Sequence, residues 1–261
     1  ITPLVAALPF WGNGSISSFY DAVFEATAGI TTTGSTVLSN VEIQPVSLLL
    51  WRSMLNGLGG IGIVIFAVAL SPFLGTGGMN LFNNENSDTE EKFLPKIRYI
   101  ANDIIFVYIL LNVLCTVLLK SLGMHWFEAV NWAMVTISTG GFAIKNNSIA
   151  YYDNATIETV EALFMLLGAL PITYFILIYK KKSLDSLIHN SQVNTFLKLI
   201  AVYILILTLF YAYQNDMALV KSFRLISFNV IAAITTCGMF SSDYTTWGTW
   251  SAVVFLLLFF A

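Results

Sequence analysis

One five-residue pattern, Ile-(Ser or Thr)-Thr-x-Gly, occurs three times in this chain of 261 residues. The copies are ITTTG at 30–34, ISTGG at 137–141 and ITTCG at 234–238. They lie roughly a hundred residues apart, a period far longer than that of a solenoid repeat. The chain is therefore expected to contain three similar units, each delivering one hydroxyl-rich turn that ends in glycine. Such turns, gathered around a common axis, would build a cation site.

The composition places these units in a membrane. Hydrophobic residues make up 57% of the chain and charged residues 10%, whereas soluble domains carry about 25% charged residues. A core of this size cannot bury so much apolar surface, so much of it must face lipid. The scattered Lys and Arg residues and a net charge of -3 argue against a nucleic-acid partner. Cys115 and Cys237 lie far apart in apolar stretches, so neither a disulfide nor a transition-metal site is expected, and no cofactor is expected.

Long apolar runs predict membrane-spanning helices, which need about 20 residues. They cover 45–70, 99–119, 157–179 and 196–213. Pro171 lies inside the third run and is expected to kink it. Two further runs, 2–11 and 247–261, look like parts of spanning helices, so we expect the sequence to be a piece of a longer chain.

Shorter amphipathic stretches lead into each copy of the motif. They cover 19–30, 126–137 and 223–234. A helix of about 12 residues is about 18 Å long, too short to cross roughly 30 Å of hydrocarbon. It must enter and turn back, which is possible only where protein or a water-filled cavity surrounds the turn.

These runs together predict an all-α polytopic membrane protein. Each unit would contain an outer helix, a re-entrant pore helix with its filter loop, and an inner helix, arranged around a central pore. The units are expected to cover 1–82, 83–195 and 196–261. For a single copy of the motif, capping or packing by small residues would be the better interpretation. Three copies in register, each after a short helix, favour the pore instead.

Charged residues give the expected orientation, because cytoplasmic loops are enriched in Lys and Arg. Two loops on one side hold seven of the basic residues: Lys92, Lys96, Arg98, Lys180, Lys181, Lys182 and Lys198. The filter turns then open outward. The short helices enter from outside and direct their negative C-terminal ends toward the membrane centre.

Several charged side chains are candidates for supporting the pore helices. Asp21 and Glu128 stand near the start of a short helix, where they complement the positive end of its dipole. Arg52 is expected either to pair with Glu25 or Asp21 and so brace the first pore helix, or to snorkel to the membrane surface. Asp103 and Glu161 are expected to be solvated near helix ends, where Glu161 could also meet cations in the outer vestibule.

The chain resembles the Trk/Ktr/HKT superfamily of potassium transporters, and most closely its bacterial Trk-type membrane subunit. The resemblance rests on ITTTGST, ISTGGF and ITTCGMF at the turns, and it spans nearly the whole chain. Further matching segments are WRSMLNGLGGIG at 51–62, LSPFLGTGGMNLF at 70–82 and GGFAIKNNSIAYYDNAT, which ends at Thr156. Members of the family have four such units around one pore, so the resemblance implies that a fourth filter turn is absent from this chain.

The resemblance implies a K⁺ filter, in which backbone carbonyl groups replace the hydration shell of the ion. The corresponding residues are Thr31, Thr32, Thr33, Gly34, Ser138, Thr139, Gly140, Gly141, Thr235, Thr236, Cys237 and Gly238. In the family, glycine at the last position of every turn goes with K⁺ preference and serine in the first turn goes with Na⁺. The hydroxyl groups of Thr31, Ser138 and Thr235 would add ligands or, as we favour, tie the loop together.

The expected function is therefore K⁺ uptake across the cytoplasmic (inner) membrane. Whether transport is channel-like or coupled to H⁺ or Na⁺ is left open. The resemblance also implies a homodimer and a cytosolic nucleotide-binding regulatory subunit. Two alternatives are the ion-conducting subunit of an ATP-driven potassium pump and a Na⁺-permeable transporter of the same superfamily.

An enzyme is disfavoured by the distribution of the reactive residues. His125 and His189 are the two histidines of the chain; they are expected in loops on opposite sides of the membrane, and no G-x-S-x-G elbow accompanies them. Gly57, Gly59 and Gly62 spell the G-x-G-x-x-G of dinucleotide-binding proteins, but they lie in an apolar helix without a preceding strand. Close helix packing explains these glycines better.

Overall fold

The computed structural model describes residues 1–70, 93–182, 187 and 189–258, and within them it contains helices and no strand. Three helices are long and apolar enough to cross a membrane. They are α3 (Val46–Leu70), the part of α4 (Phe93–Ser121) from Tyr99 onward, and α9 (Ser191–Gln214). The all-α, polytopic membrane architecture is thereby confirmed. The matching segment at 70–82 falls outside the described residues from 71 onward.

Two of the three short helices have the predicted bounds. They are α2 (Phe19–Ile30) and α5 (Trp126–Ile137), each of 12 residues. The Ser18 side chain caps α2 by accepting from a backbone N–H group, and the His125 side chain does the same for α5. His125 is therefore a helix cap and not simply a solvated loop residue.

The third short helix, α10 (Leu219–Ile234), begins one turn earlier than the predicted 223–234. It has no side-chain cap, and it packs along α9. Of the residues in the additional turn, Ser222 is buried, whereas Leu219 and Val220 are exposed.

The predicted span at 157–179 is two helices, α6 (Ala155–Ala169) and α7 (Ile172–Lys181). They meet at 90°, a much sharper bend than the expected kink. Pro171 has no N–H group for the helix ladder, and it disfavours helical angles at the residue before it. Leu170 accordingly has an extended backbone, with ψ of 145°.

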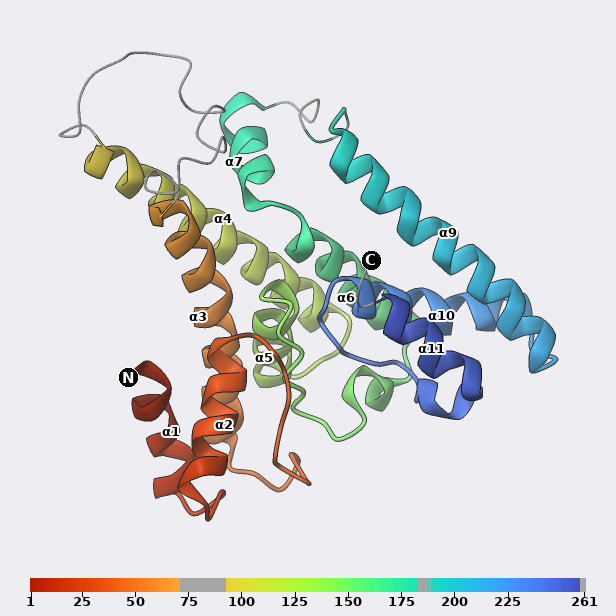
Figure 1. Ribbon diagram of the computed structural model, residues 1–261, viewed down its shortest axis with the longest axis horizontal. Helices are drawn as coiled ribbons and strands as arrows, with labels where there is room; N and C mark the ends of the chain where they lie inside the picture. The colour runs from red at the N-terminus through yellow and green to blue at the C-terminus, as the bar shows by residue number, and fades with distance from the viewer. Residues whose placement is uncertain (71–92, 183–186, 188, 259–261) are drawn as a thin grey trace.

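The units lie side by side in chain order (Figure 1). At one end α1 (Thr2–Gly12) packs against α2, and at the other α11 (Thr249–Leu258) packs near α10. Between them α5 contacts α3, α4 and α6. The end of α3, the start of α4, α7 and the start of α9 all lie toward the upper edge of Figure 1. Two 3₁₀ helices, η3 (Ser148–Tyr152) and η4 (Tyr244–Trp247), occupy the loops that follow the second and third turns.

Candidate functional site: the three glycine turns

The three turns share one backbone conformation. The second hydroxyl residue of each motif has a positive φ, and so does its glycine. The values are 54° and 74° for Thr32 and Gly34, 51° and 70° for Thr139 and Gly141, and 57° and 73° for Thr236 and Gly238. Positive φ is a genuine outlier for a β-branched residue, and such strain concentrates at functional sites. The same outlier at the same position three times marks a required backbone path.

Hydrogen bonds at the ends of the pore helices explain this path. After α2, the N–H groups of Thr32 and Thr33 donate to the carbonyl oxygens of Gly29 and Ala28, at 3.1 and 2.9 Å. This is a Schellman motif, in which a left-handed residue ends the helix. Thr139 and Gly140 repeat it after α5.

The third turn departs by one residue in this pattern. Thr236 N–H donates to the Ala233 carbonyl, as in the other two turns. The hydrogen bond that spans more residues is made by Gly238 N–H, not Cys237 N–H, and it goes to the Ala232 carbonyl at 3.0 Å. The third unit therefore ends its helix in a slightly wider turn than the other two.

The last glycines of the first two motifs bring the turns into direct contact. A Cβ atom added to Gly34 would lie 2.4 Å from the carbonyl oxygen of Gly140, and one added to Gly141 would lie 1.8 Å from that of Cys237. At Gly238 nothing described lies within 4 Å. The first turn thus contacts the second, and the second contacts the third. The close approaches leave no room for a side chain at the first two glycines.

The hydroxyl groups that follow the pore helices bond to the helices themselves. Thr31 Oγ1 donates to the carbonyl oxygen of Thr27 at 2.8 Å, and Thr235 Oγ1 donates to that of Ile231 at 2.8 Å. Ser138 Oγ donates to Val135 at 3.2 Å. All three hydroxyls therefore tie the turn to the preceding helix.

A buried ion pair supports the first turn. Arg52 Nε on α3 lies 2.9 Å from Glu25 Oε1 on α2, and the side chains are 1% and 0% exposed. Glu25 also accepts from the hydroxyl group of Thr36, at 2.8 Å, and from the N–H group of Val37, at 2.9 Å. Of the two acids expected as partners of Arg52, Glu25 is the one bound. The chain that follows Gly34 is thereby fixed to α2.

The same region of α3 reaches the second unit. Arg52 Nη1 donates to the carbonyl oxygen of Ala143 at 2.8 Å, and the Arg52 guanidinium lies 4.3 Å from the centre of the Phe142 ring. One turn further along, the Asn56 amide donates to the Gly29 carbonyl at 2.8 Å and accepts from Phe142 N–H at 3.2 Å. Asn56 was not identified from the sequence. A polar amide inside an apolar run, four residues after Arg52, was a usable signal.

The acids at the starts of the pore helices have different surroundings. Asp21 is exposed, and its N–H group donates to the capping Ser18 hydroxyl at 3.4 Å. Glu128 pairs with Lys145, which follows the second turn, at 2.9 Å. The Lys145 ammonium also lies 4.2 Å from the centre of the Tyr151 ring. Both acids lie in the first helical turn, where they complement the dipole.

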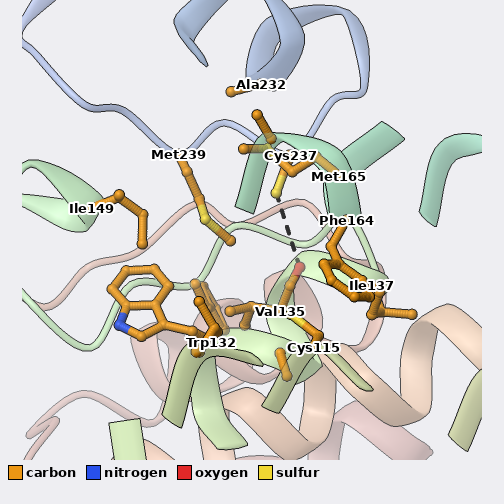
Figure 2. Close-up of a cluster of buried hydrophobic side chains, with 14 of the residues drawn as sticks. Cys115, Trp132, Val135, Ile137, Ile149, Phe164, Met165, Ala232, Cys237 and Met239 are labelled. Atoms are coloured by element: carbon orange, nitrogen blue, oxygen red, sulfur yellow. Dashed lines mark hydrogen bonds between the residues drawn. The ribbon is translucent and has the colours of Figure 1, made fainter. Parts of the chain in front are cut away.

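The third turn packs against the second pore helix. Figure 2 shows Cys237 and Met239 among Trp132, Val135 and other buried side chains, with the Cys237 thiol 4.0 Å from the Val135 carbonyl oxygen. Both cysteines are buried and free. No group of three His, Cys, Asp or Glu residues that could hold a metal ion occurs within the described ranges.

The two acids that were expected to be solvated differ from each other. Asp103 is partly exposed and forms an ion pair with Lys180, whereas Glu161 is fully buried. The expectation for Glu161 is wrong because α6 places it against α5 and α10, not at the vestibule.

A cavity of about 390 Å³ adjoins the turns. Thr32, Ser138 and Thr139 line one part of it, and the break at Leu170 and Pro171 lines another. Since Pro171 cannot donate a helix hydrogen bond, the carbonyl group of Leu167 is released from the usual ladder at this break. The cavity therefore reaches from the first two glycine turns to the break between α6 and α7.

The chain is similar in sequence and in fold to known proteins. A family model described as TrkH, cation transport protein, matches residues 4–259. The Trk system potassium uptake protein TrkI of Halomonas elongata is 38% identical over 98% of this chain and 52% of its own. TrkG of Escherichia coli K12 is 34% identical over 98% of this chain and 53% of its own. The crystal structure of the potassium transporter TrkH from Vibrio parahaemolyticus has a TM-score of 0.88 at 25% identity, covering 99% of this chain and 53% of that one. The chain thus spans about half the length of the relatives that it matches.

Proposed function

Because the chain belongs to the TrkH family of cation transport proteins, we propose that it forms three quarters of a K⁺ filter. The full-length protein would take up potassium ions across the cytoplasmic membrane. The carbonyl groups of 31–34, 138–141 and 235–238 would replace the hydration shell of the ion. The single observation that carries the proposal is the left-handed threonine and glycine pair, repeated in all three turns.

Electrostatics support a cation at this place. The short helices α2, α5 and α10 end at the turns, so the negative ends of their dipoles meet there. The hydroxyl groups of Thr31, Ser138 and Thr235 donate to helix carbonyls and so hold the turns in place. The backbone carbonyls are the proposed ligands. Glycine at the end of each turn supports K⁺ rather than Na⁺ as the preferred ion, in line with the resemblance to the family.

The relatives favour an uptake protein over the subunit of an ATP-driven pump, because proteins named as Trk system potassium uptake proteins match 97–98% of the chain. We also propose that the full-length protein is a homodimer and that a cytosolic nucleotide-binding subunit regulates it. Cross-linking in native membranes, with and without that subunit, tests both partners.

The filter is tested by uptake in a host that lacks its own potassium-uptake systems. Cells carrying the full-length protein are compared with cells carrying Gly34→Ser, Gly141→Ser or Gly238→Ser, with K⁺ and Na⁺ uptake normalised to the amount of protein in the membrane. We expect each substitution to lower the preference for K⁺ roughly tenfold, which corresponds to about 1.4 kcal/mol. Gly62→Ser is the control, because nothing lies within 4 Å of a Cβ atom there. Unchanged ion preference in all three filter variants would exclude the proposed filter.

A further inference from the structure

Glu161 is a buried acid next to the filter turns that the proposed filter does not use. Its side chain is 0% exposed. Oε2 lies 2.5 Å from the hydroxyl oxygen of Thr136 on α5, and Oε1 has no hydrogen-bond partner among the described residues. An ionised carboxylate buried in this way costs several kcal/mol unless a cation or several donors compensate it.

The symmetry of the units shows what is missing around Glu161. Gly59 on α3 and Gly168 on α6 occupy the same place, because each lies against the last carbonyl group of its own pore helix, at Ile30 and Ile137. Seven residues before them stand Arg52 and Glu161. Arg52 has Glu25 as its partner, whereas Glu161 belongs to no ion pair in the described part of the chain.

None of the described titratable groups that interact electrostatically with Glu161 is a cation. Cys115 on α4, Tyr152 on η3 and Cys237 in the third turn interact with it electrostatically, and all three are neutral when protonated. On the packed helices, Arg224 of α10 is paired with Glu158 and Asp153. Glu128 of α5 is paired with Lys145. The environment therefore favours the neutral acid.

The Thr136 hydroxyl connects this acid to the third turn. Its oxygen lies 2.5 Å from Glu161 Oε2 and 4.0 Å from the sulfur of Met239, which directly follows the filter glycine Gly238. A hydroxyl group has one hydrogen to donate, so it cannot serve both acceptors. If Glu161 is ionised, Thr136 must donate to the carboxylate. If Glu161 carries a proton, the acid donates to Thr136, and Thr136 is free to donate to Met239.

We propose that Glu161 is held as a neutral acid and acts, through Thr136 and Met239, as a positioning residue for the third filter turn. Loss of its proton to solvent would turn the Thr136 hydroxyl toward the carboxylate and release Met239. This inference rests on the proposed filter, because the turn that it positions is the third side of that filter. Its ligand is a proton, and its effect is on ion preference.

Infrared spectroscopy of the full-length protein in liposomes tests the protonation state without any transport. At neutral pH we expect the C=O band of a protonated carboxylic acid that is absent from Glu161→Gln. Absence of any band attributable to Glu161 would overturn the inference, whatever the protein transports. If the band is present but the protein moves no K⁺ at any pH, the proposed function fails and the neutral acid stands.

The positioning role is tested by K⁺ and Na⁺ uptake into the same liposomes as the pH is raised. Above its midpoint each pH unit lowers the neutral fraction of an acid about tenfold, and we expect the K⁺ preference of the parent protein to fall with it. Glu161→Gln, whose amide can still donate to Thr136, should keep its preference at every pH. Thr136→Val, which removes the connecting hydroxyl, should have a reduced preference that no longer depends on pH. Identical pH profiles for the parent and Glu161→Gln would overturn the role.

Discussion

Units 1 and 2 place different ionisable residues at the same position of their inner helices, a base in the first and an acid in the second. In unit 1 the residue is Arg52, and Glu25, Thr36 and the Ala143 carbonyl satisfy its charge. In unit 2 the residue is Glu161, which has a single hydroxyl partner. The position behind the pore helix therefore does not require a salt bridge. It tolerates either a fully paired charge or, by our inference, a group that can become neutral.

The largest effect is expected for Arg52→Met, which tests the paired charge of unit 1. The substitution leaves the Glu25 carboxylate buried without its cation, and breaking such a pair costs about 3–5 kcal/mol. We expect a large fall in the thermal unfolding midpoint of the purified protein in detergent. Arg52→Met combined with Glu25→Leu removes both charges and should recover most of the loss. A mild effect of Arg52→Met alone would mean that Glu25 is not held as a carboxylate.

The second test compares the helix contacts of the two units. A Cβ atom on Gly59 would lie 2.0 Å from the Ile30 carbonyl oxygen, while one on Gly168 would lie 2.8 Å from that of Ile137. Overpacking typically costs about 1–3 kcal/mol, so Gly59→Ala should destabilise the protein toward the upper end of that range and Gly168→Ala less. Gly62→Ala, with open space around it, is the matched control in thermal unfolding and should be neutral or slightly stabilising. The reverse order of the two units would contradict the alignment of their inner helices.

A smaller effect is expected for Glu161→Leu. If Glu161 is neutral, the substitution removes about one ordinary hydrogen bond, worth roughly 0.5–1.5 kcal/mol. Thermal unfolding of the purified variant in detergent measures this loss of stability, and the result is compared with that of Arg52→Met. A loss as large as that of Arg52→Met would show that Glu161 is charged and paired in the folded protein.

The smallest effect concerns the partly exposed pair of Lys145 and Glu128 in unit 2. Burial disfavours the Lys145 charge, but its hydrogen bond and attraction to Glu128 outweigh this and raise the pKa of Lys145. The contribution of the pair to folding stability is therefore complete below the ordinary lysine pKa of 10.5. It is lost as the pH rises through the raised pKa of Lys145. A double-mutant cycle with Lys145→Met and Glu128→Gln should give about 0–1 kcal/mol and weaken with salt. A coupling energy between Lys145 and Glu128 that does not change with salt would contradict the partial exposure of the pair.

Much of the architecture was readable because its signals are local. The bounds of α2 and α5 followed from an acid in the first turn and a glycine turn at the end. The start of α10 and the right-angled break at Pro171 were not read correctly. No side-chain cap marks the start of α10. At Pro171, the extended backbone of Leu170 turns the expected kink into a break.

The site was predicted unevenly for a similar reason. The motif located the turns, but their shared positive φ at Thr32, Thr139 and Thr236 is a tertiary property that needs coordinates. The choice of Glu25 over Asp21, and the burial of Glu161, depend on which helix faces which. A side chain that binds a backbone carbonyl of another unit, as Arg52 does at Ala143, leaves no pattern in the sequence.

The contacts between the filter glycines limit how such a protein can evolve. Here Gly34 faces the backbone of the second turn and Gly141 that of the third, so a side chain gained in one unit would displace a carbonyl group in the next. The first two turns are thus each constrained by the backbone of the next turn, and under the proposed filter a change of selectivity there would involve adjacent turns together.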